Sequence, residues 1–376
     1  APMPEAVLQA WKDAAAFTVP IEKLQAVASQ RIAKVTGAEA GLVTSGAAAA
    51  LLLGTAAILA RNNPARMEKL PHCDGFPHAM IIAREQRSGY DHAVRAAGAK
   101  LVEVGFNEIV ANAGVRRTEA WEHEAAITPE TAGIVYVDSP NSQPRLADVV
   151  EVAHRHGLPV IVDAAGELPP RENLRDLTAT GADLVCFSGG KAIRGPQSTG
   201  ILCGRRELIA SAALQMLDMD DHPELWAPPR EWIDRSQFAG MPRHGIGRAL
   251  KVGKEEIVAL VKAVELFADG AYAEESKRAR VKLERVSAAI ATLADIRAAL
   301  TNGTHSESLP NLEITFPRAN GAADAFAACR RLREGSPPVY VGHGKLSEGT
   351  LVINPMCLRE DQVEPLSRRL REELSG

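Results

Sequence analysis

The stretch that decides the fold reads Leu158-Pro-Val-Ile-Val-Asp-Ala-Ala-Gly166, and it is followed by Leu184-Val-Cys-Phe-Ser-Gly-Gly-Lys191 and Thr199-Gly-Ile-Leu-Cys203. Apolar runs of this kind, rich in Val and Ile, are typical of strands buried on both faces of a mostly parallel sheet. Similar runs precede them at 79–83, 100–104 and 133–137. Helical stretches between the runs, at about 90–98 and 146–156, indicate crossover connections and a doubly wound α/β domain.

Beyond about residue 206 the pattern changes. Residues 216–250 mix Met, His, Pro, Trp and Arg as a loop-rich segment. A long helix is predicted from about 253 to 289, with a break near Gly270. The tail offers strands at 312–316, 339–341 and 351–353, with helices near 321–334 and 360–374. We therefore expect an N-terminal helical segment (1–30), a large domain (31–250) and a smaller C-terminal α+β domain (251–376).

Composition excludes several classes of protein. Of 376 residues, 46% are hydrophobic and 24% charged, which is ordinary for a globular chain. The net charge of −4, with no basic cluster, argues against a nucleic-acid surface. The longest apolar run, at 46–60, is shorter than the roughly 18 residues of a membrane span. Five scattered cysteines without a CxxC pair, and a start that lacks a signal-peptide core, favour a cytoplasmic protein without a metal site.

The first candidate for chemistry is Val43-Thr-Ser-Gly-Ala-Ala-Ala-Ala50, a turn that opens into an Ala- and Leu-rich helix. Ser45, Gly46 and Ala47 would present free backbone N–H groups and a hydroxyl at a helix N-terminus, where a phosphate is favoured. The alternative is an ordinary helix cap, which uses the same residue types.

The second candidate is Asp163, which ends the strand Val160-Ile-Val-Asp163. Open α/β sheets bind ligands at this edge. A carboxylate there can pair with a protonated pyridine nitrogen and strengthen a cofactor as an electron sink. The alternative is that Asp163 caps the following turn.

The third candidate is Lys191, after the strand that ends at Phe187. Ser188 can reach a phosphate, and two glycines allow close backbone approach before the lysine. A lysine at the mouth of a sheet that is not fully hydrated is suited to Schiff-base chemistry. The alternative is an ordinary surface lysine.

Taken together, the three candidates predict one site for pyridoxal 5'-phosphate (PLP). Phosphate cup, pyridinium partner and Schiff-base lysine follow one another in the order that such a fold needs, with Asp163 one predicted strand before Lys191. The fold expected is therefore the α/β, aspartate-aminotransferase-like fold, PLP fold type I.

Residues from about 30 to 260 resemble the selenocysteine synthase-like branch of the fold-type-I PLP enzymes, which includes L-seryl-tRNA(Sec) selenium transferase and lyases related to D-glucosaminate-6-phosphate ammonia-lyase. The resemblance rests on these segments: Thr36-Gly-Ala-Glu-Ala-Gly-Leu-Val-Thr-Ser-Gly-Ala-Ala-Ala49, Gly89-Tyr-Asp-His-Ala-Val-Arg95, Leu158-Pro-Val-Ile-Val-Asp-Ala-Ala165, Phe187-Ser-Gly-Gly-Lys-Ala192, Gly195-Pro-Gln197 and Gly247-Arg-Ala-Leu-Lys-Val-Gly-Lys-Glu-Glu256. It implies a large domain with a seven-stranded, mostly parallel sheet.

By this resemblance Lys191 carries the cofactor, Asp163 meets the pyridinium, and Ser45, Gly46, Ala47 and Ser188 hold the phosphate. Gln86 stands near the position where many relatives have a ring-stacking His; it has an amide plane but no aromatic face. The family also implies homodimers or larger assemblies with active sites near subunit interfaces, where Gln197 and Ser198 are candidate contacts.

The expected reaction is α,β-elimination of a small amino acid or amino sugar acid with a leaving group at Cβ, here a hydroxyl. The freed amine of Lys191 removes the Cα proton, and the products are a keto acid and ammonia. Arg359 is the first candidate to bind a substrate carboxylate or phosphate, because arginine pairs such groups bidentately. Weaker candidates are Arg84, Arg87, Arg243 and Arg248, with His92 and His244 as proton relays.

Three other functions remain open at this point. Transfer on seryl-tRNA is disfavoured by the acidic balance of the chain. Aminotransfer needs the same lysine and aspartate as elimination. A PLP-binding protein with a regulatory role would share the site but show no response of its absorbance to amino acids.

Overall fold

The computed structural model describes residues 1–106, 116–302, 308–317 and 320–375. The chain divides into two compact units, of which the larger is Met3–Asp269 and the smaller is Gly270–Gly376 with Ala1–Pro2. The division falls just after α10 (Lys254–Ala268), which packs on α1 (Glu5–Ala15) and α2 (Ile21–Thr36). Because of these contacts, α10 and the N-terminal helices belong with the large unit, so the division lies later than the expected boundary after residue 250.

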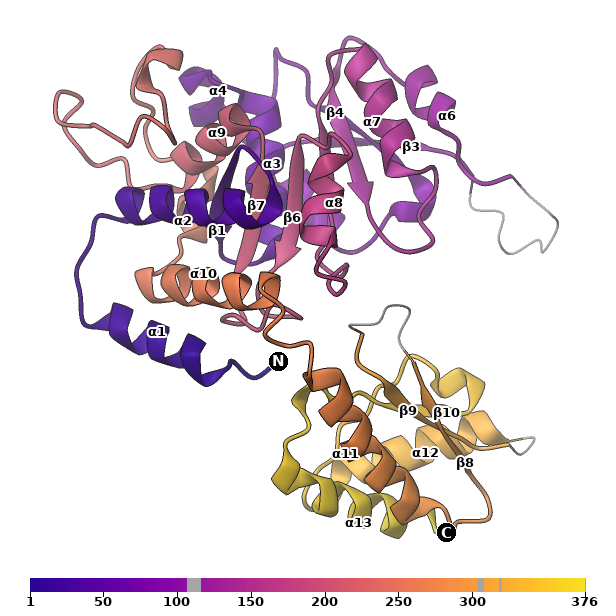
Figure 1. The fold of residues 1–376 in the computed structure, drawn as a ribbon. Helices are drawn as coiled ribbons and strands as arrows, with labels where there is room; N and C mark the ends of the chain where they lie inside the picture. Colours follow the sequence, from indigo (N-terminus) through magenta and orange to yellow (C-terminus); the bar gives the residue numbers. More distant parts are fainter. Residues whose placement is uncertain (107–115, 303–307, 318–319, 376) are drawn as a thin grey trace. The chain divides into compact units, whose positions relative to one another are not determined.

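A seven-stranded sheet forms the centre of the large unit (Figure 1). Its strand order is β1-β7-β6-β5-β4-β2-β3, and only β7 runs antiparallel to its neighbours. This confirms the mostly parallel sheet expected from the sequence. The strands are β1 (Ala40–Thr44), β2 (Ala79–Ala83), β3 (Lys100–Val104), β4 (Thr131–Val137), β5 (Val160–Asp163), β6 (Leu184–Ser188) and β7 (Gly200–Gly204).

Strand β1 is the one strand of this sheet that the apolar runs did not reveal. Its five residues precede the Ser45-Gly46 turn directly, so the sequence suggested only the turn and the helix after it. β1 is fully buried and pairs with β7, a strand far along the chain. Pairing at such a separation leaves no local signal, since it depends on the rest of the sheet.

Two groups of helices cover opposite faces of the sheet (Figure 1). On one face α3 contacts α4, α5 and α9, and on the other α2 contacts α8 and α10. The remaining helices of the large unit are α3 (Ala47–Ala60), α4 (Pro64–Lys69), α5 (Asp91–Ala96), α6 (Ala120–Ala125), α7 (Leu146–Arg155), α8 (Asn173–Ala179) and α9 (Arg206–Met216), with the short 3-10 helices η1 (Arg84–Gln86), η3 (Arg235–Gln237) and η4 (Ile246–Leu250).

Helix α3 is apolar all round because it is buried on nearly every side. Each residue from Ala49 to Ala60 except Leu52 is buried. A Cβ placed on Gly54 would lie 2.5 Å from Cδ1 of Ile161 on β5, so the glycine lets the helix lie close to the sheet. The long apolar run at 46–60 is thus a core helix, and no helix in the described ranges is long and apolar enough to cross a membrane.

The smaller unit is an α+β domain, as expected. Its three-stranded antiparallel sheet has the order β10-β9-β8. Leucines from helices and strands meet in its core. The elements are α11 (Glu275–Ile290), β8 (Arg297–Thr301), β9 (Asn311–Thr315), α12 (Gly321–Glu334), η5 (Leu346–Glu348), β10 (Thr350–Ile353), η6 (Pro355–Cys357), η7 (Glu360–Gln362) and α13 (Val363–Leu374).

One predicted strand of the smaller unit is wrong and another was missed. Residues 339–341 form no strand, because the Val339 N–H bonds the Leu332 carbonyl at the end of α12 at 2.8 Å. Only Gly342 makes an isolated bridge, to Val352. The third strand is instead β8, whose Arg-Ala-Ala-Leu-Thr sequence has little β-branched or aromatic content.

Candidate active site

Strands β1, β6 and β7 bring two predicted phosphate-binding segments together at one edge of the sheet. Thr44, the last residue of β1, pairs with Gly200 of β7, and Ser188, the last residue of β6, pairs with the same glycine from the other side. Ser45 follows Thr44 directly. The Ser45 turn and Ser188 therefore flank Gly200, although they are far apart in the sequence.

Gly200 lies against the start of helix α3. A Cβ at position 200 would lie 2.4 Å from the carbonyl carbon of Gly46 and 2.6 Å from the nitrogen of Ala47. These are backbone atoms of a turn that also joins β1 to α3, so they cannot simply move aside. Gly46 has a φ of 110°, a conformation that side chains rarely adopt. The geometry of the turn thus requires two glycines. Gly200 on β7 is needed because no Cβ fits there, and Gly46 is needed because of its positive φ.

The start of α3 is suited to bind an anion. Its first turn carries no acidic residue, and Ala48 in that turn is exposed. The unpaired N–H groups of a helix N-terminus favour negative charge. The Ser45 hydroxyl donates to the Leu250 carbonyl at 3.0 Å, so it can accept a further hydrogen bond but its proton is engaged. The anion affinity of this turn therefore rests on backbone N–H groups.

Asp163 is the last residue of β5, and it lies between β4 and β6 at the same edge of the sheet. It pairs with Val137 on β4 and with Cys186 on β6. The side chain is buried, and its Oδ1 accepts the Ala165 N–H at 3.0 Å. Burial raises the pKa of the Asp163 carboxyl, while the Ala165 N–H and the positive charge of Lys191 act in the opposite direction. A carboxylate in this position would be stabilised by a further cationic partner.

Lys191 is exposed on a tight loop that follows β6. The Gly189 N–H donates to Thr199 O at 2.9 Å, and a Cβ on Gly190 would lie 2.7 Å from Cα of Gln197. The two glycines before Lys191 are needed because the loop folds back on its own backbone. A Cβ on Gly166 would lie 3.9 Å from Nζ of Lys191, so the amine lies over the turn after β5. The structure thus places Lys191 and Asp163 at the same edge of the sheet, and their roles toward a cofactor stay a prediction.

Two acidic residues at the same edge were not predicted. Asp138 follows β4, and its N–H donates to the Asp163 carbonyl at 2.9 Å. Glu167 lies in the turn after β5, where its N–H donates to Ala164 O at 3.1 Å. Burial raises the pKa of both carboxyls. The available signal was the same as for Asp163, namely an acidic residue just beyond an apolar run.

Gln86 is buried and holds the loop that follows β4. Its Oε1 accepts the Val137 N–H at 3.0 Å, and its Nε2 donates to the Gln143 carbonyl at 3.3 Å. Both ends of the amide are thus bonded to backbone on either side of Asp138. These contacts support a positioning role for Gln86 beside the site; stacking on a cofactor ring stays a prediction.

The arginines considered for a substrate carboxylate are already paired with acidic side chains. Arg359, in the smaller unit, donates twice to Asp361, at 3.0 Å in each case, which raises the pKa of its guanidinium. The other pairs are Arg84 with Glu103, Arg87 with Asp91 and Glu103, Arg243 with Glu68, and Arg248 with Asp218. A substrate anion would compete with these carboxylates, and the role of Arg359 stays a prediction.

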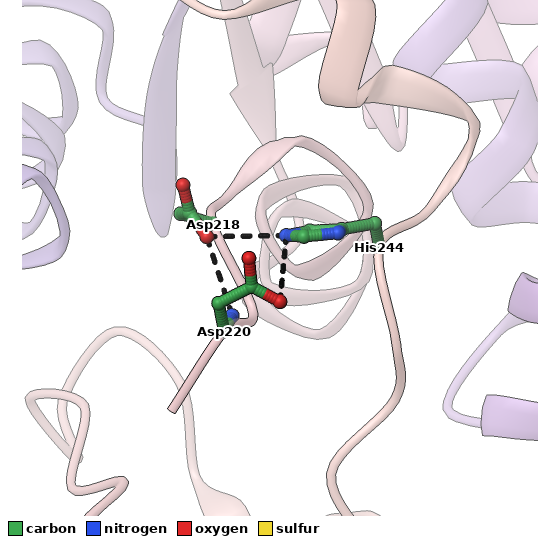
Figure 2. A group of neighbouring side chains, drawn as sticks. All are labelled: Asp218, Asp220 and His244. Atoms are coloured by element: carbon green, nitrogen blue, oxygen red, sulfur yellow. Dashed lines mark hydrogen bonds and ion pairs between the residues drawn. The ribbon is translucent and has the colours of Figure 1, made fainter. Parts of the chain in front are cut away.

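The two histidines considered as proton relays are exposed. His92 lies on α5, and His244 lies beside Asp218 and Asp220 (Figure 2). Nε2 of His244 is 3.1 Å from Asp218 Oδ1 and 3.8 Å from Asp220 Oδ1. Hydrogen bonds from His244, the Asp220 N–H and Arg248 lower the pKa of Asp218 to about 2. Arg248 thus already pairs with Asp218, and His244 belongs to a surface network of polar contacts with these two carboxylates.

Sequence comparisons agree with this geometry. A family model described as L-seryl-tRNA selenium transferase matches residues 91–219. A 5'-C-glycyluridine monooxygenase-decarboxylase from a Streptomyces species is 30% identical over 378 residues, covering 98% of this chain and 85% of the relative. The chain belongs to the selenocysteine synthase-like branch of the fold-type-I PLP enzymes.

Other members and solved structures support the same family. D-glucosaminate-6-phosphate ammonia lyase from Salmonella typhimurium is 28% identical, over 97% of this chain and 89% of the relative. The solved structure of a D-glucosaminate-6-phosphate ammonia-lyase superposes with a TM-score of 0.78 at 26% identity, covering 100% of this chain and 92% of the other. A cysteine desulfurase from Escherichia coli, with 18% identity, a TM-score of 0.54 and coverage of 99% and 92%, shares the fold.

Proposed function

We propose that this chain binds PLP and catalyses α,β-elimination on a small amino acid or amino sugar acid with a hydroxyl group at Cβ, releasing ammonia and a keto acid. One observation carries the proposal. Asp163, Lys191 and the open start of α3 converge on one edge of the sheet. The similarity to an ammonia lyase over nearly the whole chain supports elimination among the reactions that such a site can perform.

The residues at this edge fit PLP in three respects. The turn that begins α3 offers backbone N–H groups to a phosphate and carries no acidic residue. Ser188 lies on β6, with only β7 between it and β1. The buried Asp163 carboxyl would be neutralised by a protonated ring nitrogen. Lys191 is exposed at the same edge, with its amine over the turn that follows β5. We propose that the phosphate is held by Ser45, Gly46, Ala47 and Ser188. Asp163 would pair with the ring nitrogen, and Lys191 would bond to the aldehyde carbon of the cofactor.

Bound PLP would supply an electron sink for the pair of electrons left at Cα. Lys191 has two tasks in this scheme. Its amine holds the cofactor until substrate arrives, and once released it takes the Cα proton as a general base. Asp163 stays ionised beside the ring nitrogen, so that the positive charge needed for electron withdrawal is maintained.

Ammonia release decides the reaction class. We would test serine and threonine of both configurations and amino sugar acid phosphates, with purified protein that has been incubated with PLP. A lyase forms ammonia and keto acid in equal amounts and leaves the visible absorbance of the cofactor in place. An aminotransferase instead converts the cofactor to its amine form when no keto acid is supplied. Absence of bound PLP would contradict the proposal outright.

Oxidative decarboxylation is the second candidate, because one relative at 30% identity carries that activity in its name. The two reactions differ in what they consume. Oxidative decarboxylation needs dioxygen and releases carbon dioxide, whereas elimination needs neither an oxidant nor the loss of carbon. Repeating the assay under argon therefore separates them: elimination keeps its rate, and the oxidative reaction stops.

Replacing Gly200 by alanine is expected to weaken PLP binding by about 10-fold or more, with a cost in stability of roughly 1–3 kcal/mol. The new methyl group would overlap the Gly46-Ala47 backbone and displace the start of α3. The measurement is a PLP titration of cofactor-free protein, followed by a thermal melt. The matched control is Gly240→Ala, because a Cβ at Gly240 meets nothing within 4 Å. Equal affinity in both variants would contradict the assignment of the phosphate cup.

A further inference from the structure

Glu167 is an acidic side chain at the site for which the proposed function has so far given no task. It lies in the turn after β5, four residues beyond Asp163. The turn is held at both ends: the Glu167 N–H donates to Ala164 O at 3.1 Å, and Asn173 Nδ2 donates to the Glu167 carbonyl at 2.7 Å. The backbone at Glu167 is therefore well fixed relative to β5.

The amine of Lys191 lies over this same turn. Gly166, the residue before Glu167, is so close that a Cβ on it would lie 3.9 Å from Lys191 Nζ. The Glu167 carboxyl is half-buried and interacts electrostatically with Lys191, with Asp138 and with Asp163. An acid and a base thus share one edge of the sheet.

The surroundings favour the protonated form of Glu167. Burial contributes most to raising the pKa of its carboxyl, and the negative charges of Asp138 and Asp163 raise it further. Lys191 acts in the opposite direction. A carboxyl group with a raised pKa keeps its proton to higher pH than an ordinary exposed glutamate, which makes it better suited to act as a general acid.

We propose that Glu167 is the general acid that protonates the leaving hydroxyl at Cβ of the substrate, as a residue separate from the base Lys191. This inference rests on the proposed function and extends it from the site to the class of leaving group. It assigns the two proton transfers of the reaction to two side chains on neighbouring loops, after β5 and after β6.

The proton balance of the step is simple. Lys191 takes the Cα proton, and the electron pair of that C–H bond becomes the new Cα–Cβ double bond. The Cβ–O bond breaks with its electron pair on oxygen, and the Glu167 proton joins that oxygen to give water. The step leaves Lys191 protonated and Glu167 ionised. Transfer of one proton from the ammonium to the carboxylate, directly or through water, restores both groups without an oxidant or a co-reactant.

A leaving group that needs no proton provides the sharpest test. Chloride departs unassisted, so β-chloroalanine should not require Glu167, whereas serine should. For Glu167→Gln we expect elimination from serine to fall by about 10²-fold or more while elimination from β-chloroalanine stays within about threefold of wild type. Both enantiomers of each compound are assayed, with pyruvate formation as the readout.

The matched control is Glu172→Gln, an exposed glutamate on the same loop that is expected to leave both rates unchanged. An equal fall with serine and β-chloroalanine in Glu167→Gln would overturn the proposal, because it would indicate a general positioning effect. An unchanged serine rate would overturn it as well. Wild-type protein that eliminates neither compound, nor any of the wider substrate panel, would sink both this inference and the proposed function.

A second readout needs neither cofactor nor turnover. In cofactor-free protein labelled with ¹³C-glutamate, the carboxyl resonance that disappears in Glu167→Gln belongs to Glu167. We expect it to titrate above the ordinary range of a glutamate carboxyl, because burial and the charges of Asp138 and Asp163 raise its pKa. Asp138→Asn should lower the Glu167 midpoint, because it removes one of the repelling charges. A Glu167 midpoint within the ordinary range of a glutamate would contradict the proposal.

The pH profile follows from the same groups. The acid form of Glu167 is required for a hydroxyl leaving group, so the ratio of the serine rate to the β-chloroalanine rate should fall as pH rises through the pKa of Glu167. Ionisation of Lys191 and Asp163 affects both substrates and cancels in this ratio. The ratio should lose its pH dependence in Glu167→Gln, and a ratio independent of pH in wild type would overturn the assignment.

Discussion

Replacing Lys191 by alanine is expected to give a colourless protein whose elimination rate is lower by about 10⁴-fold, the upper end of the range for loss of a general base. The reason is that, in the proposed mechanism, one amine both anchors the cofactor and removes the Cα proton. The measurement combines visible absorbance after dialysis with mass spectrometry after borohydride reduction. In wild type, reduction should fix the cofactor to the peptide that contains Lys191.

The control for this variant is Lys23→Ala, on the exposed side of α2. It should keep its colour, its borohydride label and its rate. A Lys191→Ala protein that still takes up the label at another lysine would show that the covalent anchor had been misassigned. The fold would stand in that case, since Lys191 is exposed and makes no contribution to the core.

Replacing Asp163 by asparagine is expected to lower the elimination rate by about 10- to 10³-fold, because loss of an adjacent carboxylate lowers the pKa of a cationic partner by about 1–3 units. Asparagine keeps the hydrogen bond from the Ala165 N–H but cannot hold the ring nitrogen protonated. PLP should still bind, since the phosphate cup and Lys191 are untouched. The measurement is kcat for elimination at saturating PLP.

The same substitution should act differently on stability. Burial raises the pKa of Asp163 above its unfolded value, so its ionised form costs folding free energy at neutral pH. This cost decreases as pH falls through the folded pKa and is absent below the unfolded pKa. Cofactor-free Asp163→Asn should therefore be at least as stable as wild type in a thermal melt at neutral pH. Asp176→Asn, on the exposed side of α8, is the control for both effects. A less stable Asp163→Asn with full activity would contradict the assigned role.

The parallel strands and the residues at their ends could be predicted because their signals are local. A Val- and Ile-rich run such as 160–163 identifies a buried strand from its own composition, and Asp163 marks its end. Strand β1 carried no such signal, since it forms through β7, a partner far along the chain. Strand β8 pairs with the next strand, β9, but its sequence has little β-branched or aromatic content. The false strand at 339–341 shows the converse, because its first N–H bonds a helix end in place of a sheet.

Among the site residues, the order along the chain was enough to associate Lys191 with Asp163, but it did not reveal their neighbours. Asp138 and Glu167 were indistinguishable from other acidic residues until the sheet placed the ends of β4, β5 and β6 side by side. Gln86 could be located near the site, yet its bonds to the backbone on either side of Asp138 depend on how η1 meets the loop after β4.

By itself, therefore, the sequence determined the class of fold, and it predicted the order of the candidate cofactor-binding segments and Lys191 as the candidate anchor. These follow from local composition and from where each strand ends. Only the tertiary structure decided that Gly200 must lie against Gly46, that the Ser45 hydroxyl is engaged by Leu250, and that the Lys191 amine lies near Gly166, the residue before Glu167. The physical reason is register: which residues face each other across β1, β7 and β6 is settled by packing of the whole sheet, and no single segment contains that information.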